Sequence, residues 1–357
     1  MSYMVTKVTW AMALVAFICA GCRSGKKESS AAEDKPKAEA KQKQSYPSMG
    51  SIERREKAID DLIAADAKIE KLADGFDWSE GPVWMKQGDY LVFSDVPRNV
   101  VLKWKEGEGI KEFLRPSGYT GSTPRGGEPG SNGLTTDRDG MLILCQHGDR
   151  RVVRLERNGE FTPIAQFYQY RRFNSPNDLD YKSNGDLYFT DPPYGLVKLN
   201  DDPAKELKFN GVYRVTPKGQ VNLMIDNLTY PNGIAFSPDE KTLYVAISDP
   251  KKPYIMAYDV KPDGTVLNGR IFFNASTLMA PDRKGLPDGL KVDRRGNLFA
   301  TGPGGVLVIS PEGKLLGTLL TGEATANCGW GGDGSVLYIT ADMYLCRVQT
   351  KTKGKGF

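Results

Sequence analysis

The sequence contains very little histidine, and this scarcity excludes most nitrogen-based chemistry. His147 is the only histidine in 357 residues. A zinc site made from several histidines is therefore excluded, and a serine or cysteine triad has a single candidate base. The motifs G-x-S-x-G, H-E-x-x-H and G-x-G-x-x-G and the EF-hand loop are also absent. For an enzyme, these absences leave metal-assisted chemistry on a neutral or anionic substrate.

Charge and cysteine content exclude two further classes of protein. Lys and Arg number 48 against 44 Asp and Glu, so charge gives no argument for nucleic-acid binding. The chain has five cysteines, and Cys145, Cys328 and Cys346 remain after the two near the N-terminus. No spacing resembles a disulfide framework. A Cys328–Cys346 pair is an alternative, but we expect free buried thiols.

The first residues predict export. Lys7 precedes an apolar run from Trp10 to Cys22, which is shorter than a bilayer span. Ala20-Gly21-Cys22 resembles the bacterial lipobox, with Cys19 where an aliphatic residue is usual. We therefore expect residues 1–21 to be a lipoprotein-type signal peptide and Cys22 to carry lipid, anchoring the protein at the periplasmic or cell-surface side of a membrane. An ordinary cleaved signal peptide is the alternative.

Two short segments are expected to separate this leader from the main domain. Residues 22–50 are rich in Lys, Glu, Ala, Ser and Gln, and such a composition predicts a flexible tether. In residues 51–66, Ile52, Ile59, Leu62 and Ile63 follow near-helical spacing, which predicts one short helix. The main domain is then expected over residues 67–357.

The main domain alternates short apolar runs with Gly, Pro, Asn and Asp turns, which predicts an all-β fold. Six units each open with a polar residue just before an apolar run, and in most of them it stands beside Gly or Pro. The opening residues are Glu80, Asn132, Asn177, Asn232, Asp288 and Asn327. They are spaced by 39 to 56 residues, and units of roughly 40 to 50 residues with several strands are typical of a propeller. We therefore predict a six-bladed β-propeller.

The opening residues are expected to form a ring. The first strand of each propeller blade lines the central channel, so equivalent positions surround one axis. All six residues carry side-chain oxygen, the donor that Ca²⁺, Mg²⁺ and Mn²⁺ prefer. The alternative is that Asn-Gly and Asp-Gly simply form turns. That alternative does not account for Glu80, since Glu is not a turn residue.

Four motifs in this order resemble a known family. The segments FDWSEGPVW, RRFNSPNDLDYKSNGDLYFTDPPYG, YPNGIAFSPDEKTLYV and LPDGLKVDRRGNLFAT are similar to those of the gluconolactonase family. That family includes regucalcin (senescence marker protein 30) and luciferin-regenerating enzyme, and this chain is most similar to its bacterial lactonase branch. The resemblance covers residues from about Lys68 onward. It implies a six-bladed propeller with one divalent cation in the channel.

The resemblance also implies a set of functional residues. By motif, the cation would be held by Glu80, Asn177, Asn232 and Asp288. Ca²⁺ is the expected ion, and Mg²⁺, Mn²⁺ or Zn²⁺ would also suit such ligands. The cation would polarise a lactone carbonyl and activate a water molecule. Asp288 would then act as general base, and Asn177 would orient the substrate as well as bind the metal.

The substrate side of the pocket is expected to include Asn132, His147, Asn177 and Tyr194. A lone histidine after a strand also fits a purely structural role. Ser175 stands where animal members of the family have an arginine. The leading hypothesis is a metal-dependent lactonase that opens a gluconolactone-like sugar lactone or related cyclic ester, with a small-molecule lactone as its partner. The alternatives are a non-catalytic propeller with a structural Ca²⁺, or another hydrolase on the same scaffold, such as a phosphotriesterase.

Overall fold

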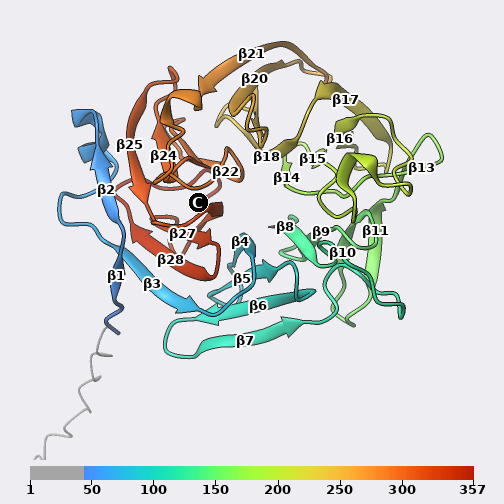
Figure 1. Cartoon of the computed structure of the whole chain (residues 1–357), viewed down its shortest axis with the longest axis horizontal. Helices are drawn as coiled ribbons and strands as arrows, with labels where there is room; N and C mark the ends of the chain where they lie inside the picture. Colours follow the sequence, from blue (N-terminus) through green and yellow to red (C-terminus); the bar gives the residue numbers. More distant parts are fainter. Residues whose placement is uncertain (1–43) are drawn as a thin grey trace, which may run out of the picture. The chain divides into compact units, whose positions relative to one another are not determined.

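The computed structural model describes residues 44–357, and these residues form a six-bladed β-propeller (Figure 1). The first two blades are each four antiparallel strands: β4 (Ser79–Met85), β5 (Tyr90–Asp95), β6 (Val100–Lys105) and β7 (Gly109–Leu114), then β8 (Ser131–Thr136), β9 (Leu142–Gln146), β10 (Arg151–Leu155) and β11 (Phe161–Ala165). A small hairpin, β12 (Phe167–Tyr168) and β13 (Arg171–Arg172), follows them.

The third and fourth blades repeat the same arrangement. Their strands are β14 (Leu179–Tyr181), β15 (Leu187–Asp191), β16 (Asn210–Val215) and β17 (Val221–Leu228), then β18 (Pro231–Phe236), β19 (Thr242–Ile247), β20 (Tyr254–Val260) and β21 (Val266–Asn274). Two short 3-10 helices, η2 (Leu199–Asp201) and η3 (Ser276–Leu278), lie in the connecting loops. The predicted all-β, six-bladed fold is confirmed.

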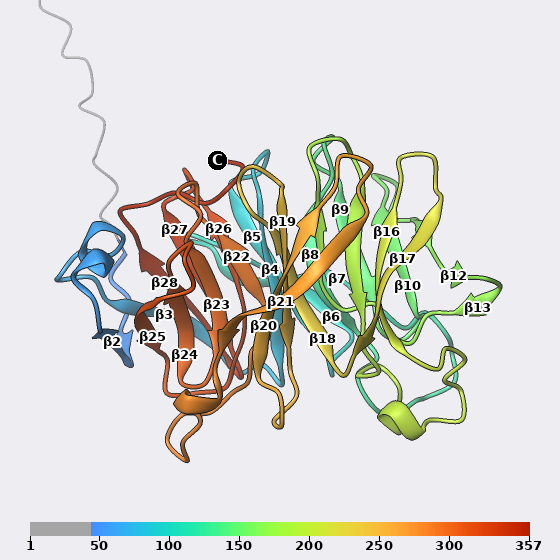
Figure 2. The same cartoon turned by 90° about the horizontal axis from the view of Figure 1, so that it is seen from above.

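The last two blades each contain five strands because the N-terminal segment adds to them. The fifth blade has β22 (Leu290–Val292), β23 (Leu298–Gly302), β24 (Gly305–Ile309), β25 (Leu315–Leu320) and β2 (Ser51–Arg54). The sixth has β26 (Thr325–Gly331), β27 (Val336–Ala341), β28 (Tyr344–Gln349), β3 (Ile69–Asp74) and β1 (Ser48–Met49). Strand β3, from the start of the domain, therefore closes the ring against β28, from its end (Figures 1 and 2).

The segment before the main domain differs in detail from the sequence prediction. A short helix is present, but it is the 3-10 helix η1 (Lys57–Asp61), and residues 51–54 form strand β2. Strand β1 pairs with β3, so the expected tether does not extend to residue 50. The near-helical apolar spacing arose because Ile59, Leu62 and Ile63 all pack into one core between the fifth and sixth blades.

The packing of η1 makes a direct prediction about stability. Ile59 is fully buried in the core shared with the last two blades. Ile59→Val is expected to lower the free energy of unfolding by about 1 kcal/mol, because one buried methylene group is lost. Chemical denaturation checks this value. The same change at Ile271, which is 51% exposed, is the matched control and is expected to have no effect. Equal stability of both variants would show that η1 is not part of the folded core.

The three cysteines of the main domain are free and buried, as expected. Cys328 and Cys346 lie on strands β26 and β28, and both are in register with Ile339 on the strand between them. Two intervening strand spacings separate them by about 9–10 Å. A disulfide requires Cα atoms closer than about 7 Å, so the geometry excludes this pair.

The predicted signal peptide, lipidation at Cys22 and most of the tether lie outside the described residues and remain predictions. Within residues 44–357, no helix is long and apolar enough to cross a membrane.

Candidate active site

The opening residues of the blades converge on the propeller axis. A cavity of about 550 Å³ is lined by all four predicted metal ligands, Glu80, Asn177, Asn232 and Asp288, and by Asn132. These residues come from five different blades and lie at or just before the innermost strands β4, β8, β14, β18 and β22, which surround the centre of the ring (Figure 1). Asn327, the sixth opening residue, lies beside Glu80 and donates from its Nδ2 to Glu80 Oε2 at 3.2 Å.

The glycines that follow several opening residues allow this convergence. The Gly133 amide donates to the Asn177 carbonyl of the next blade at 2.7 Å, and a Cβ on Gly133 would lie 2.5 Å from that oxygen. Gly233 is related to Asp288 in the same way, and its Cβ would lie 2.1 Å from the Asp288 carbonyl. Any side chain here would push neighbouring blades apart. Close approach between blades therefore explains the repeated Gly at these two positions, whose φ angles are not positive.

Hydroxyl groups on the second strand of a blade form hydrogen bonds that hold the backbone of the opening residue in the next blade. Thr190 Oγ1 on β15 donates to the Asn232 carbonyl at 2.7 Å, and Ser94 Oγ on β5 donates to the Asn132 carbonyl at 2.9 Å. Each bond crosses to the following blade. The backbone that carries the oxygen-bearing side chains is therefore held by buried hydrogen bonds.

The Glu80 carboxylate is buried and poorly compensated. It accepts hydrogen bonds from the Gly81 amide at 2.9 Å and from Asn327. Burial raises the pKa of Glu80 to about 8, and the nearby Asp178 and Glu128 carboxylates act in the same direction. The charged form of a carboxylate in this position is destabilised unless a positive charge lies close to it.

Asp288 is a second carboxylate of this kind. Burial raises the pKa of Asp288 well above its usual value, and the charge of Glu80 raises it further. Its Oδ1 atom is buried and has no hydrogen-bond partner. Two carboxylates that line one cavity, one of which raises the pKa of the other, favour binding of a cation between them.

The asparagine side chains present oxygen to the cavity. Asn232 Nδ2 donates to Ser248 Oγ at 2.9 Å, and Ser248 in turn donates to the Pro287 carbonyl. Asn177 Nδ2 lies 3.4 Å from His147 Nε2. The Oδ1 atoms of Asn132 and Asn177 are buried without partners. Because buried polar atoms in folded proteins are almost always satisfied, these oxygens are suited to accept a positively charged ligand.

The residues present fit a divalent cation. Two carboxylates and two or three amide oxygens form a hard donor set suited to Ca²⁺. In the described part of the chain, no group of three or more His, Cys, Asp or Glu side chains is placed to hold a metal. Two of the four expected ligands, Asn177 and Asn232, are asparagines, and a group that contains only His, Cys, Asp and Glu does not include them.

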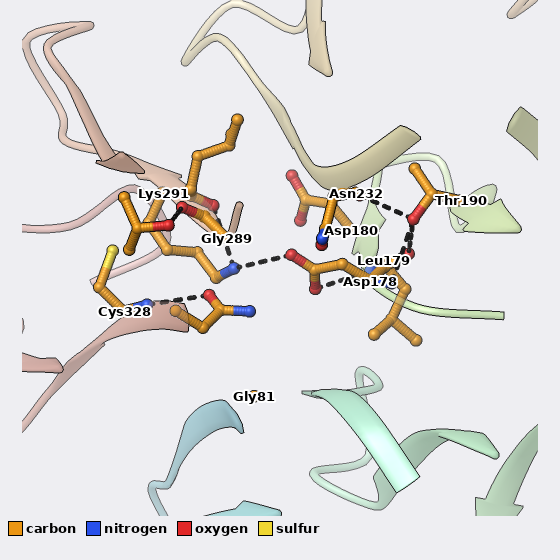
Figure 3. A network of polar contacts seen from close by, with 12 residues as sticks. Gly81, Asp178, Leu179, Asp180, Thr190, Asn232, Gly289, Lys291 and Cys328 are labelled. Atoms are coloured by element: carbon orange, nitrogen blue, oxygen red, sulfur yellow. Dashed lines mark hydrogen bonds and ion pairs between the residues drawn. The ribbon is translucent and has the colours of Figure 1, made fainter. Parts of the chain in front are cut away.

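A partly buried ion pair lies beside the cavity. Lys291 Nζ is 3.7 Å from Asp178 Oδ2 and donates to the Leu290 carbonyl (Figure 3). Asp178 Oδ1 accepts the Leu179 amide at 2.9 Å. Burial raises the pKa of Asp178, and the charge of Lys291 opposes this effect. Lys291 is therefore the cation that compensates the third carboxylate near the axis.

Of the two remaining predicted substrate residues, Tyr194 lines the cavity and His147 does not. Tyr194 lines the cavity, its ring stacks on Tyr230 with centroids 5.9 Å apart, and its hydroxyl is buried without a partner. His147 is fully buried behind Asn177 and is not part of the cavity wall. A direct contact between His147 and a substrate therefore does not fit this structure, since the side chain has no exposed surface.

The sequence analysis did not identify Glu128, Ser248 or Arg283, which also line the cavity. Arg283 Nη2 donates to both carboxylate oxygens of Glu53 on strand β2, each at 3.0 Å. These residues lie in loops that differ between blades, so the internal repeat gives no indication of them. Trp78, an aromatic residue just before β4 in the sequence, also lines the cavity.

The fold and the cavity define a six-bladed propeller with an oxygen-rich axial site. Residues 78–342 match the family described as SMP-30/Gluconolactonase/LRE-like region. The chain belongs to this family.

Individual relatives agree with this assignment. The chain is 38% identical over 321 residues to a gluconolactonase of Zymomonas mobilis, with 88% of this chain and 90% of that protein covered. The structure of a gluconolactonase from Xanthomonas campestris superposes with a TM-score of 0.74 and 32% identity, covering 87% of this chain and 99% of the other. A regucalcin from Agrobacterium tumefaciens, described as a calcium-binding protein, has a TM-score of 0.63 at 17% identity and covers 80% and 94%; it shares the fold.

Proposed function

We propose that the protein hydrolyses a sugar lactone, or a related cyclic ester, in a reaction that depends on one divalent cation. The protein is a lactonase of the family identified above, and it shares 38% identity with a gluconolactonase. The observation that carries the metal dependence is the group of buried, unpartnered oxygens of Asn132, Asn177 and Asp288 beside Glu80 in one cavity. Ca²⁺ is the proposed ion, because all the donors are oxygens.

Each side chain of the site would have its own role in the reaction. A cation held by Glu80, Asn177, Asn232 and Asp288 would supply Lewis acidity to the lactone carbonyl. Asp288 would take a proton from the attacking water and return it to the ring oxygen as the carbon–oxygen bond breaks. The raised pKa of Asp288 suits a group that must hold a proton during the reaction. Tyr194 and Trp78 would form the walls that hold the substrate ring.

Removal of the cation tests this function. Treatment with a chelator is expected to abolish lactone hydrolysis, and Ca²⁺ is expected to restore it, because the carbonyl loses its Lewis acid and the two carboxylates take up protons. The measurement is acid release from a panel of lactones, including gluconolactone, by stripped protein supplied with Ca²⁺, Mg²⁺, Mn²⁺ or Zn²⁺. Full activity in metal-free protein would contradict the proposal.

The same panel, extended with phosphotriesters and with thermal unfolding measured with and without cation, separates the two alternatives. A binding module would take up the cation and gain thermal stability but hydrolyse none of the esters. A phosphotriesterase on this scaffold would hydrolyse phosphotriesters faster than lactones.

A further inference from the structure

Behind the cavity, three side chains form a chain of contacts that ends at a proposed metal ligand. Glu128 Oε2 lies 3.1 Å from His147 Nδ1, and His147 Nε2 lies 3.4 Å from Asn177 Nδ2. Glu128 comes from the loop before β8 and also lines the cavity. His147 follows strand β9 and is fully buried. The contacts therefore connect a partly exposed carboxylate to the amide of Asn177.

The packing around the histidine fixes its position. A Cβ on Gly195 would lie 2.7 Å from the His147 Cβ and 3.0 Å from its carbonyl oxygen. The His147 amide donates to the Gly130 carbonyl at 3.1 Å. The backbone and Cβ of His147 are thus held between two loops. Its Nδ1 atom has no hydrogen-bond partner of good geometry, and the nearest acceptor is the Glu128 carboxylate.

The location of the ring proton determines how Asn177 is oriented. A carboxylate beside Nδ1 favours the tautomer that carries its proton on Nδ1. Nε2 then has a free lone pair and accepts a hydrogen bond from the Asn177 amide nitrogen. Asn177 Oδ1, which has no partner in the protein, is left to face the cation. A proton on Nε2 would instead attract Asn177 Oδ1 and turn the amide nitrogen toward the metal site.

We propose that Glu128 and His147 are positioning residues, which fix the amide of Asn177 with its oxygen toward the cation site. The inference deepens the proposed function and rests on it for the role of Asn177. It replaces the expected contact between His147 and a substrate with an indirect role. Glu128, which the sequence analysis did not identify, becomes part of the metal centre without binding the metal.

The tautomer is measurable directly because His147 is the only histidine. Nitrogen NMR of protein labelled in the imidazole ring, at neutral pH and without metal, reports the protonation of one ring alone. The expected result is a proton on Nδ1 and none on Nε2. A ring protonated on Nε2, or on both nitrogens, would overturn the inference. This result does not depend on whether the protein binds a cation or hydrolyses a lactone.

Cation affinity provides the second measurement, by calorimetric titration of stripped protein with Ca²⁺. Glu128→Ala is expected to weaken binding by about 10- to 100-fold, as is usual when a group that orients a metal ligand is lost. Glu128→Gln is the matched control. Its side-chain oxygen can still lie beside Nδ1, so it is expected to weaken binding much less than Glu128→Ala, by the loss of one nearby charge alone. Equal weakening in both variants would mean that Glu128 acts through its charge alone, which contradicts the inference.

These variants distinguish a loss of cation binding from a failure to fold. Glu128 is 35% exposed, so its replacement is not expected to prevent folding, whereas His147 is buried. If the wild type itself takes up no Ca²⁺, the proposed function fails, and the NMR result still decides whether Glu128 and His147 orient Asn177.

Discussion

Asp288→Asn is expected to lower kcat for lactone hydrolysis by about 10²- to 10⁴-fold, the usual contribution of a general base. The amide keeps one oxygen for the cation but cannot accept the proton of the attacking water. The raised pKa of Asp288 has no counterpart in an amide. Steady-state kinetics with saturating Ca²⁺ measures the effect. Added cation is not expected to rescue this variant.

Glu80→Gln is the informative comparison for this prediction. Glu80 contributes charge and an oxygen but is not the proposed base, so its loss is expected to weaken cation binding, and excess Ca²⁺ is expected to restore part of the activity. Asp282→Asn, on an exposed position of a nearby loop, is the control and should retain full activity. If Asp288→Asn and Asp282→Asn have the same kcat, Asp288 is not the base.

Lys291→Met is expected to destabilise the metal-free protein by about 1–2 kcal/mol, less than for a fully buried pair because the Lys291 side chain is 26% exposed. Lys291 is the cation nearest to Asp178, and without it the carboxylate is left buried beside Glu80 and Asp288. Removal of the lysine is costly because the buried Asp178 charge is then uncompensated. Urea denaturation in the presence of a chelator measures the change.

The double variant Asp178→Asn, Lys291→Met provides the control for this second prediction. An asparagine at position 178 keeps an oxygen that accepts the Leu179 amide, as Asp178 Oδ1 does, and it carries no charge. The double variant is therefore expected to recover much of the stability lost in Lys291→Met. A single variant as stable as the wild type would show that Lys291 does not compensate Asp178.

The internal repeat made the fold and the centre of the site predictable. A polar residue before each first strand recurs six times, and in a propeller such equivalent positions must face one axis. This geometry brings Glu80, Asn177, Asn232 and Asp288 together although they are far apart in sequence. Gly133 and Gly233 were visible too, but the sequence alone did not distinguish a turn residue from one required by close packing between blades.

The features that break the repeat were not predictable in the same way. Strand β3 closes the ring, and nothing in residues 69–74 specifies its partner β28. Strand β2 was mistaken for part of a helix because buried residues around η1 imitate helical spacing. Glu128 and Arg283 lie in loops without counterparts in other blades. Their positions follow from the three-dimensional arrangement of the loops, which no periodic pattern encodes.

The most direct test is a crystal structure of the protein soaked with Mn²⁺ and recorded at a wavelength where manganese scatters anomalously. The account predicts one strong peak in the axial cavity, within coordination distance of oxygens from Glu80, Asn177, Asn232 and Asp288. A cavity without a peak in crystals of protein that hydrolyses lactones, or a peak bound only by other residues, would contradict it.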